Sequence, residues 1–265
     1  GLILFYLTSK RKQIVSNNIQ NLKDWAISRN LNNSLLSEES IHIVKQIYKS
    51  NASNFFCSIS LMNKPLELIK QHIKFGNLEL IKKIQNNGKG TIILFSHSGP
   101  WELTVLLPKL APSFFKARKS IMVYRPLNNF YFNKWYLKRR SRFGAQLSSK
   151  DDGFFNILKE LKKGSSVFLA SDIRMQSGPK YKLFDKEASI SKIPYTFHKA
   201  TKAPVIGINI VKSGTLAWEI KFTEIISNDN EVYPESSFLR AINEHLEETI
   251  YEKPYDYFFF QDRYR

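Results

Sequence analysis

Two side chains in one short segment have the types and spacing that acid–base chemistry needs. In "LFSHSGPWELTVLL", residues 94–107, His97 follows an apolar, strand-like run and Glu102 stands five positions later in the next apolar run. A histidine at a strand end, oriented and charge-stabilised by a carboxylate, suits a general base that takes a proton from a hydroxyl. The same residues also suit a plain strand-turn-helix joint, with His97 as a buried imidazole and Glu102 as part of a helix cap.

The residues between His97 and Glu102 predict the local backbone. Pro100 suits the first position of a helix, because its missing N–H costs no hydrogen bond there. Glu102 then falls at the third helical position. Backbone N–H groups from Ser98 to Trp101 would lie at a helix N-terminus, where they could receive an oxyanion or a phosphate. We therefore expect Ser98 and Trp101 to belong to the same site.

The rest of the chain gives little support for a protein nucleophile or a metal centre. It contains no Gly-x-Ser-x-Gly elbow, and Cys57, the single cysteine, lies in an apolar helical segment with no base beside it. One cysteine also excludes an internal disulfide. The histidines are scattered rather than grouped at zinc-site spacing. We therefore expect the reacting hydroxyl to belong to the substrate, and we expect no metal.

The charge of the chain is strongly positive and unevenly distributed. A formal net charge of +17 over 265 residues implies an anionic partner: nucleic acid, anionic lipid, a phosphorylated substrate or an acidic carrier protein. From Leu103 to Lys150 there is no Asp or Glu, and aromatic residues are interleaved with basic ones. This mix suits a membrane interface as well as a solvated basic face. The basic residues of the stretch are Lys109, Lys116, Arg118, Lys119, Arg125, Lys134, Lys138, Arg139, Arg140, Arg142 and Lys150.

The hydrophobic pattern changes its period near residue 89. Residues 10–88 have helical spacing, whereas apolar runs of strand length alternate with helical segments afterwards. This alternation predicts an α/β fold with a mixed or largely parallel central sheet flanked by helices. In such sheets, sites form where strand ends meet helix starts, which is where His97 lies. The predicted strands are 90–96, 120–124, 166–171, 204–211 and 217–226, and the predicted helices 100–111, 128–144, 152–163, 195–202 and 235–253.

The first residues, "GLILFYLTSKRKQ", allow two interpretations. Their apolar run is far too short to cross a bilayer, which needs about 20 residues. It suits a buried first helical turn, or the tail of a membrane anchor with Lys10, Arg11 and Lys12 as its cytoplasmic flank. We therefore separate residues 1–12 from a single domain at 13–265, made of a helical lead-in (13–88) and an α/β core (89–265). No later segment is long and apolar enough to span, so we expect a soluble or peripheral body.

The segment "HSGPWE" resembles the His-x4-Glu signature of the bacterial lipid A late acyltransferases of the lauroyl/myristoyl type. This family is part of the glycerolipid acyltransferase superfamily, whose motif is His-x4-Asp. Further blocks follow in the family's order over roughly residues 10–265. "VYRPLNNFYFNKWYLKRRSRFGAQL" resembles a Tyr-Arg-Pro-Leu block with a basic helix, and "VFLASDIRM" resembles a strand that ends in Asp. "KAPVIGINI" and "NEHLEETIYEKPYDYFFFQDRYR" resemble a later strand and the closing helix and tail.

The resemblance implies a glycerolipid-acyltransferase-like fold and a reaction. An acyl chain would pass from an acyl carrier protein thioester to a hydroxyl of a lipid A precursor, with no cofactor besides the thioester of carrier protein or CoA. His97 would be the general base, and Glu102 would orient it and stabilise its charge. Arg125 would hold a phosphate or the developing oxyanion, and Asp172 would position an arginine or the acceptor. Either residue could instead be structural, in an ion pair or a turn. The basic helix would contribute Arg139, Arg140 and Arg142 to substrate binding.

The implied partners are an acidic carrier protein, the anionic inner membrane at its cytoplasmic face, and a phosphorylated glycolipid. No helix-turn-helix, zinc-finger or RNP pattern is present, so we expect no nucleic acid. Two alternatives remain: an acyltransferase acting on a phosphatidylinositol mannoside or a glycerophospholipid, and a non-catalytic basic binding protein. The sequence departs from the family's pattern at Pro100, where Asn is usual, and at Ile173, where Gln is usual. These departures bear on the acyl chain and the acceptor more than on the reaction.

Overall fold

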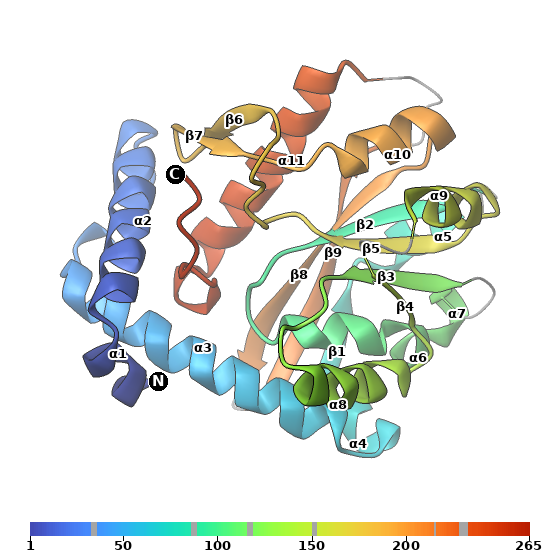
Figure 1. The fold of residues 1–265 in the computed structure, drawn as a ribbon, viewed down its shortest axis with the longest axis horizontal. Helices are drawn as coiled ribbons and strands as arrows, with labels where there is room; N and C mark the ends of the chain where they lie inside the picture. The colour runs from blue at the N-terminus through green and yellow to red at the C-terminus, as the bar shows by residue number, and fades with distance from the viewer. Residues whose placement is uncertain (33–35, 86–88, 116–118, 150–152, 215, 228–232) are drawn as a thin grey trace.

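A seven-stranded sheet forms the centre of the molecule and determines which loops can meet (Figure 1). The computed structural model describes the chain except residues 33–35, 86–88, 116–118, 150–152, 215 and 228–232. The strand order is β1-β9-β8-β2-β5-β3-β4, with β8 and β9 antiparallel and the other neighbours parallel. The strands are β1 (Ile73–Gly76), β2 (Thr91–Phe95), β3 (Ser120–Tyr124), β4 (Gln146–Ser149), β5 (Ser166–Ala170), β8 (Val205–Gly214) and β9 (Ala217–Ile226).

The predicted fold class is confirmed, and the five predicted strands correspond to β2, β3, β5, β8 and β9. The prediction of a purely helical lead-in is wrong, because β1 lies within it and pairs with β9 far along the chain. The short strand β4 and the hairpin of β6 (Lys180–Leu183) and β7 (Lys186–Ser189) were also not predicted. Each of these strands has four residues, too few for a clear alternation of apolar and polar side chains.

Helices cover both faces of the sheet because its central strands are apolar on both sides. In β2, Ile93 and Phe95 face one cluster of apolar side chains, and Ile92 and Leu94 face the other. The helices on the first face are α4 (Leu66–Lys70), α5 (Leu78–Gln85), the 3-10 helix η2 (Trp101–Leu106), α6 (Leu107–Leu110), α7 (Pro112–Phe115) and α8 (Phe130–Ser141). Those on the second face are α9 (Phe154–Lys162), α10 (Ile193–Thr201) and α11 (Glu235–Glu252).

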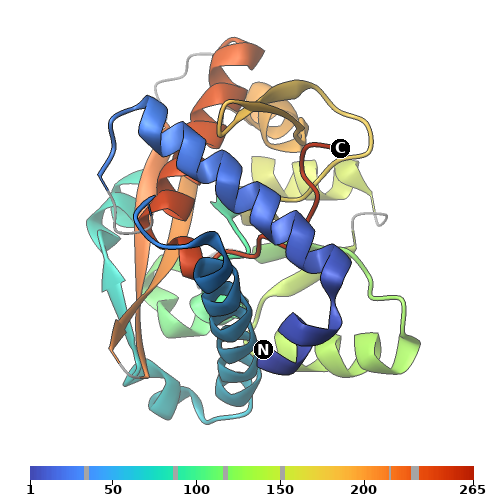
Figure 2. The ribbon, with the colours of Figure 1, turned by 90° about the vertical axis from the view of Figure 1, so that its left-hand side faces the viewer.

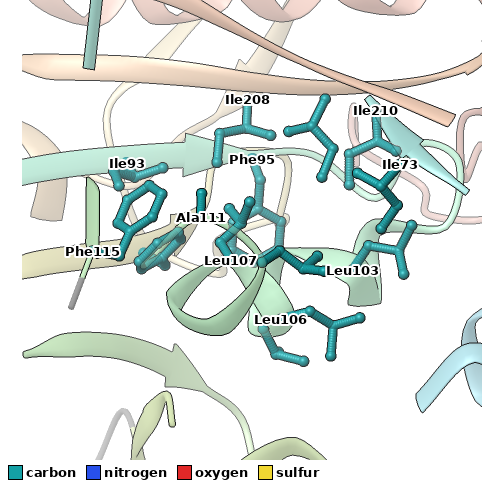
Figure 3. Close-up of a cluster of buried hydrophobic side chains, with 14 of the residues drawn as sticks. Ile73, Ile93, Phe95, Leu103, Leu106, Leu107, Ala111, Phe115, Ile208 and Ile210 are labelled. Atoms are coloured by element: carbon teal, nitrogen blue, oxygen red, sulfur yellow. The ribbon is translucent and has the colours of Figure 1, made fainter. Parts of the chain in front are cut away.

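The segment after His97 is held on the sheet by apolar packing. Leu103 and Leu107, from η2 and α6, lie among side chains of β2 and β8, including Phe95 and Ile208 (Figure 3). Leu103, Leu106 and Leu107 are fully buried. This packing fixes the direction in which the chain leaves β2, and it therefore fixes the loop that carries His97.

The N-terminal helices form a third apolar cluster with the end of the chain. These helices are α1 (Leu2–Leu7), α2 (Ser9–Ser28) and the first half of α3 (Ser40–Met62), and they pack with α11 and the C-terminal residues that follow it. Figure 2 shows α2 lying across α11 and the C-terminal residues. In α1 only Phe5 is buried, with its ring against Tyr48. Within the part of the chain that the structure describes, no helix combines the length and apolarity that crossing a membrane requires.

Candidate active site

His97 and Asp172 meet because their strands are neighbours in register. Strands β2 and β5 are parallel, and Phe95 at the end of β2 pairs with Ala170 at the end of β5. His97 and Asp172 each follow two residues later. The backbone N–H of Ser171 donates to the carbonyl of Phe95, which keeps the two chains together just beyond the paired residues. Two side chains with acid–base chemistry therefore lie at one point of the carboxyl edge of the sheet.

Asp172 holds His97 with both of its carboxylate oxygens. Oδ1 lies 2.8 Å from Nδ1 of the imidazole, and Oδ2 accepts the backbone N–H of His97 at 2.8 Å. The Asp172 side chain is 1% exposed and the His97 side chain 20%. Because an ionised carboxylate can only accept, the hydrogen sits on Nδ1 and Nε2 is left as the acceptor. A neutral imidazole with Nε2 as its acceptor nitrogen is the form that a general base needs.

The charges of this pair shift both titrations in the expected directions. Burial alone would lower the pKa of His97, but the negative charge of Asp172 and its hydrogen bond raise that pKa above its ordinary value. Burial would raise the pKa of Asp172, but the neighbouring His97 lowers it, as does the positive charge of Arg263. Asp172 is therefore ionised whenever the pair works, and it stabilises the protonated imidazole.

Glu102 does not make the contact with His97 that the sequence predicted. Its carboxylate is buried and forms a two-point ion pair with Arg140, at 2.9 Å to Nε and 2.6 Å to Nη2. The hydroxyl of Tyr136 also donates to it. Among the described residues the orienting hydrogen bond of His97 comes from Asp172 instead. Glu102 is still near enough for its charge to add to the raised pKa of His97.

The helix after His97 also differs from the prediction. Residues Trp101–Leu106 form a 3-10 helix, and Pro100 is the residue before it rather than its first residue. Glu102 makes no cap because Arg140 and Tyr136 use its carboxylate. The ring of Trp101 meets the edge of the His97 ring, with centroids 4.7 Å apart, and stacks on Phe95. Trp101 therefore forms part of the wall around the imidazole, and its predicted role in substrate binding stays a prediction.

The C-terminal segment closes the other side of the His97 loop. The N–H of Phe258 donates to the carbonyl of His97 at 2.9 Å, and the N–H of Gly99 donates to the carbonyl of Asp256 at 3.1 Å. Gly99 N–H is therefore not available for the oxyanion that the sequence reasoning assigned to this backbone. Tyr257 is buried in this segment, and Arg263 donates to the Asp172 carbonyl. Burial and the charge of Asp172 raise the pKa of Tyr257 well above its ordinary value, so the phenol stays protonated.

The family of this chain follows from comparison with known proteins. A model of the bacterial lipid A biosynthesis acyltransferase family matches residues 29–265. The chain belongs to that family. The match covers the β2–η2 loop, α8, Asp172 and the C-terminal segment, so the site described above lies within it. No curated protein matches the chain.

The family model confirms the predicted resemblance and the class of reaction. The chain is therefore an acyltransferase of lipid A biosynthesis by family. In the described parts of the chain, no group of three or more His, Cys, Asp or Glu side chains could hold a metal ion.

Of the predicted substrate-binding residues, Ser98 and Arg125 lie at the same edge of the sheet as His97, whereas Arg140 is buried in an ion pair. Ser98 is buried beside His97, and its hydroxyl has no hydrogen-bond partner among the described residues. Arg125 is exposed directly after β3, at the same edge of the sheet as His97. Arg140 is buried in its pair with Glu102 and is not presented to solvent. Lys116, Arg118 and Lys150 of the basic stretch lie outside the described residues.

Arg139 of α8 and Arg142, the residue just after α8, contact the end of α3. Arg139 donates to the side chain of Asn63, and Arg142 donates to the carbonyl of Met62 at 3.3 Å. Arg139 also lies over the ring of Trp135. These contacts attach α8 to the lead-in helix. Sequence reasoning could not identify Tyr136, Tyr257 and Arg263 as part of the site, because each lies there through partners distant in sequence.

The Glu102–Arg140 pair of the acyltransferase gives a first testable prediction. Glu102→Met and Arg140→Met should each lower the free energy of unfolding by about 3 kcal/mol or more, because each leaves an unpaired buried charge. The double variant should lose less than the sum, since neither charge is then left alone. Urea unfolding of the four proteins measures the coupling. Removal of the exposed Arg240–Glu244 pair is the matched control and should change stability by less than about 1 kcal/mol. Additive single effects would contradict this account of the buried pair.

Gly99 gives a second prediction about the His97 loop. Its φ is +60°, and a Cβ there would lie 2.7 Å from the carbonyl oxygen of Ile210. Gly99→Ala should therefore destabilise the acyltransferase by about 2 kcal/mol or more, from left-handed backbone strain plus a clash with a buried strand. Gly144→Ala is the control, since its φ is +84° but its nearest atom is the side-chain Cε of Lys109 at 3.9 Å. Thermal unfolding that ranks Gly144→Ala as the more damaging change would contradict the prediction.

Proposed function

We propose that this chain transfers an acyl group from an acyl carrier protein thioester to a hydroxyl of a lipid A precursor, with His97 as the general base. The observation that carries the proposal is the His97–Asp172 pair, in which Asp172 binds Nδ1 of a partly exposed imidazole. Family membership supplies the reaction class and the glycolipid acceptor. The donor and the role of each residue are inferred from the chemistry that this pair can perform.

The proposed reaction uses His97 first as a base and then as an acid. Nε2 takes the proton from the acceptor hydroxyl as its oxygen attacks the thioester carbonyl carbon. The tetrahedral intermediate then collapses, the carbon–sulfur bond breaks, and the leaving thiolate takes the proton from the imidazolium. Asp172 keeps the hydrogen on Nδ1 and stabilises the imidazolium between the two steps. No covalent bond to the protein is needed.

Glu102 supports this chemistry without touching the reacting atoms. Its negative charge favours the protonated form of His97, together with the closer charge of Asp172. Through Arg140 and Tyr136 it joins η2 to α8, and η2 is the helix that carries Trp101 beside the imidazole. In the proposed function Glu102 is therefore a positioning residue. Asp172 orients His97, a role that the sequence analysis had given to Glu102.

Two further residues are proposed to bind substrate. The Ser98 hydroxyl, buried and unpaired among the described residues, is a donor for the oxyanion of the tetrahedral intermediate. Arg125, exposed at the carboxyl edge of the sheet, is a donor for a phosphate of the acceptor. The net charge of +17 suits an acidic carrier protein and an anionic membrane surface. We propose that the enzyme works at the cytoplasmic face of the bacterial inner membrane.

Acyl transfer to a defined acceptor tests this function. Purified chain, laurate-, myristate- or palmitate-loaded carrier protein and a Kdo-bearing lipid A precursor should give an acylated product. His97→Ala should lower the rate by about a thousandfold, because the base is lost. His42→Ala, an exposed histidine on α3, is the control and should leave the rate unchanged. Full activity of His97→Ala would refute the site. Product only from acyl-CoA, or only with a glycerophospholipid or phosphatidylinositol mannoside acceptor, would refute the proposed donor or acceptor.

The pH dependence of kcat/KM tests the role of Asp172. As pH falls, the base is lost when His97 becomes protonated, and its raised pKa places this acid limb above the ordinary value of 6.5. Asp172→Asn removes the negative charge that raises this pKa, while burial, which lowers it, stays. The acid limb should therefore move to lower pH, and the maximal rate should fall about a hundredfold because the tautomer is no longer fixed. An acid limb that stays in place or moves to higher pH would show that Asp172 does not control His97.

A further inference from the structure

The N-terminal end of α8 exposes a group of apolar side chains. Phe130 is 70% exposed, Tyr131 81% and Phe132 44%, and Leu127 in the preceding loop is 37% exposed. Adjacent large apolar side chains exposed to water are unfavourable in free energy, and such a patch marks an interaction surface for a protein, a ligand or a membrane. We call these four residues the α8 tip. Helix α8 lies along the lower edge of the molecule (Figures 1 and 2).

The α8 tip is held in this outward arrangement by its own hydrogen bonds. The side chain of Asn129 caps the helix by accepting the N–H of Phe132 at 2.9 Å. The side chain of Asn133 accepts the N–H of Leu127 at 3.0 Å, which ties the loop to the first turn. The ring of Phe132 stacks on Trp135 and Tyr136, with centroids 5.5 and 5.9 Å apart. The exposed rings of Phe130 and Tyr131 are thus placed by a fixed helix start.

Charge complementarity indicates what binds the α8 tip. One to two turns further along α8, Lys134 and Lys138 are exposed, and the chain from Leu103 to Lys150 contains no acidic residue. Aromatic rings beside lysines are the composition of a helix at the boundary between headgroups and acyl chains. Lysines near the surface of an anionic leaflet add an attraction that salt screens. Both features fit a bilayer with anionic lipid.

A second apolar helix lies on the same side of the molecule. Ile3, Leu4, Tyr6 and Leu7 of α1 are more than half exposed, and the next helix begins with Lys10, Arg11 and Lys12. Helices α1 and α8 both lie along the lower side of the molecule in Figures 1 and 2. Both helices contact α3, through Phe5 on Tyr48 and through Arg139 on Asn63. The two helices with exposed apolar side chains therefore lie toward the same side of the molecule.

We propose that the α8 tip inserts Phe130 and Tyr131 into the interface of a bilayer that contains anionic lipid. The same helix carries Tyr136 and Arg140, which hold Glu102 beside the active site. Insertion of the tip thus sets the active site against the membrane through a single rigid helix. The binding itself does not depend on the proposed reaction. Only the consequence for catalysis rests on that proposal, through its membrane-held acceptor.

Vesicle binding tests the α8 tip directly. The chain should sediment with vesicles of phosphatidylethanolamine and phosphatidylglycerol, bind phosphatidylcholine vesicles less well, and be released in part by higher ionic strength. Phe130→Ser with Tyr131→Ser should weaken partitioning about tenfold or more, since two exposed rings no longer leave water. The matched control is Phe155→Ser with Ile27→Ser, which removes two side chains of similar exposure from α9 and α2. Equal partitioning of the tip variant and the control would overturn the proposal.

A reporter at the tip provides a second readout. With Cys57→Ser, the single cysteine of Tyr131→Cys or of Phe155→Cys can carry the polarity-sensitive fluorophore NBD. On anionic vesicles the probe at 131 should brighten and shift to shorter wavelength, and the probe at 155 should not. A probe at 131 that stays in water on bound protein would assign the tip to another partner and overturn the proposal.

Activity measurements separate this proposal from the proposed function. The Phe130→Ser/Tyr131→Ser variant should keep its turnover with detergent-dispersed acceptor but need about tenfold more vesicle-embedded acceptor. If wild-type protein transfers no acyl group, the proposed function fails while the vesicle result still stands. If transfer occurs but the tip variant needs no more vesicle-embedded acceptor than the wild type, the proposed role of the tip in catalysis fails while the reaction stands.

Discussion

The parallel pairing of β2 with β5 is the constraint on which the site depends. The register places Phe95 opposite Ala170, so His97 and Asp172 emerge at the same height from neighbouring strands. The Asp172 carboxylate binds Nδ1 of the His97 imidazole with one oxygen and the backbone N–H of His97 with the other. It therefore holds both the ring and the loop that carries it. A slip of this pairing would separate both contacts at once, because both come from one carboxylate.

Much of the fold and part of the site could be predicted from the sequence. Apolar runs of strand length identified the five strands that build most of the sheet, and His97 and Asp172 were both recognised at strand ends. What sequence could not supply was the neighbour relation of β2 and β5, which are separated by β3, α8 and α9 along the chain. Without it, Glu102 was the nearest carboxylate to His97 in sequence and received the orienting role. In space Asp172 holds that role, from 75 residues away.

Glu102 shows why local spacing misled. A carboxylate in the first turn of a helix can complement the helix dipole, and nothing in "PWELT" distinguishes that from an ion pair. The deciding partner is Arg140, a member of a basic stretch that looked uniformly solvated or substrate-facing. Burial of that arginine needs a counter-charge, and Glu102 supplies it. One member of the basic stretch is thus structural, while its neighbours Lys134 and Lys138 remain exposed on the same helix.

The N-terminal helices α2 and α3 hold the C-terminal segment in place beside the His97 loop. The amide of Asn18 on α2 donates to the carbonyls of Phe259 and Gln261, and Ser50 and Asn54 on α3 donate to Asp256. Asp256 in turn accepts the N–H of Gly99, two residues after His97. Helices α2 and α3 therefore hold the last ten residues, and those residues in turn bind both the His97 loop and the backbone of Asp172. The lead-in helix α3 thus contacts α1 through Tyr48 and the C-terminal segment through Ser50 and Asn54, so one helix joins the N-terminal helices to the segment that binds the His97 loop.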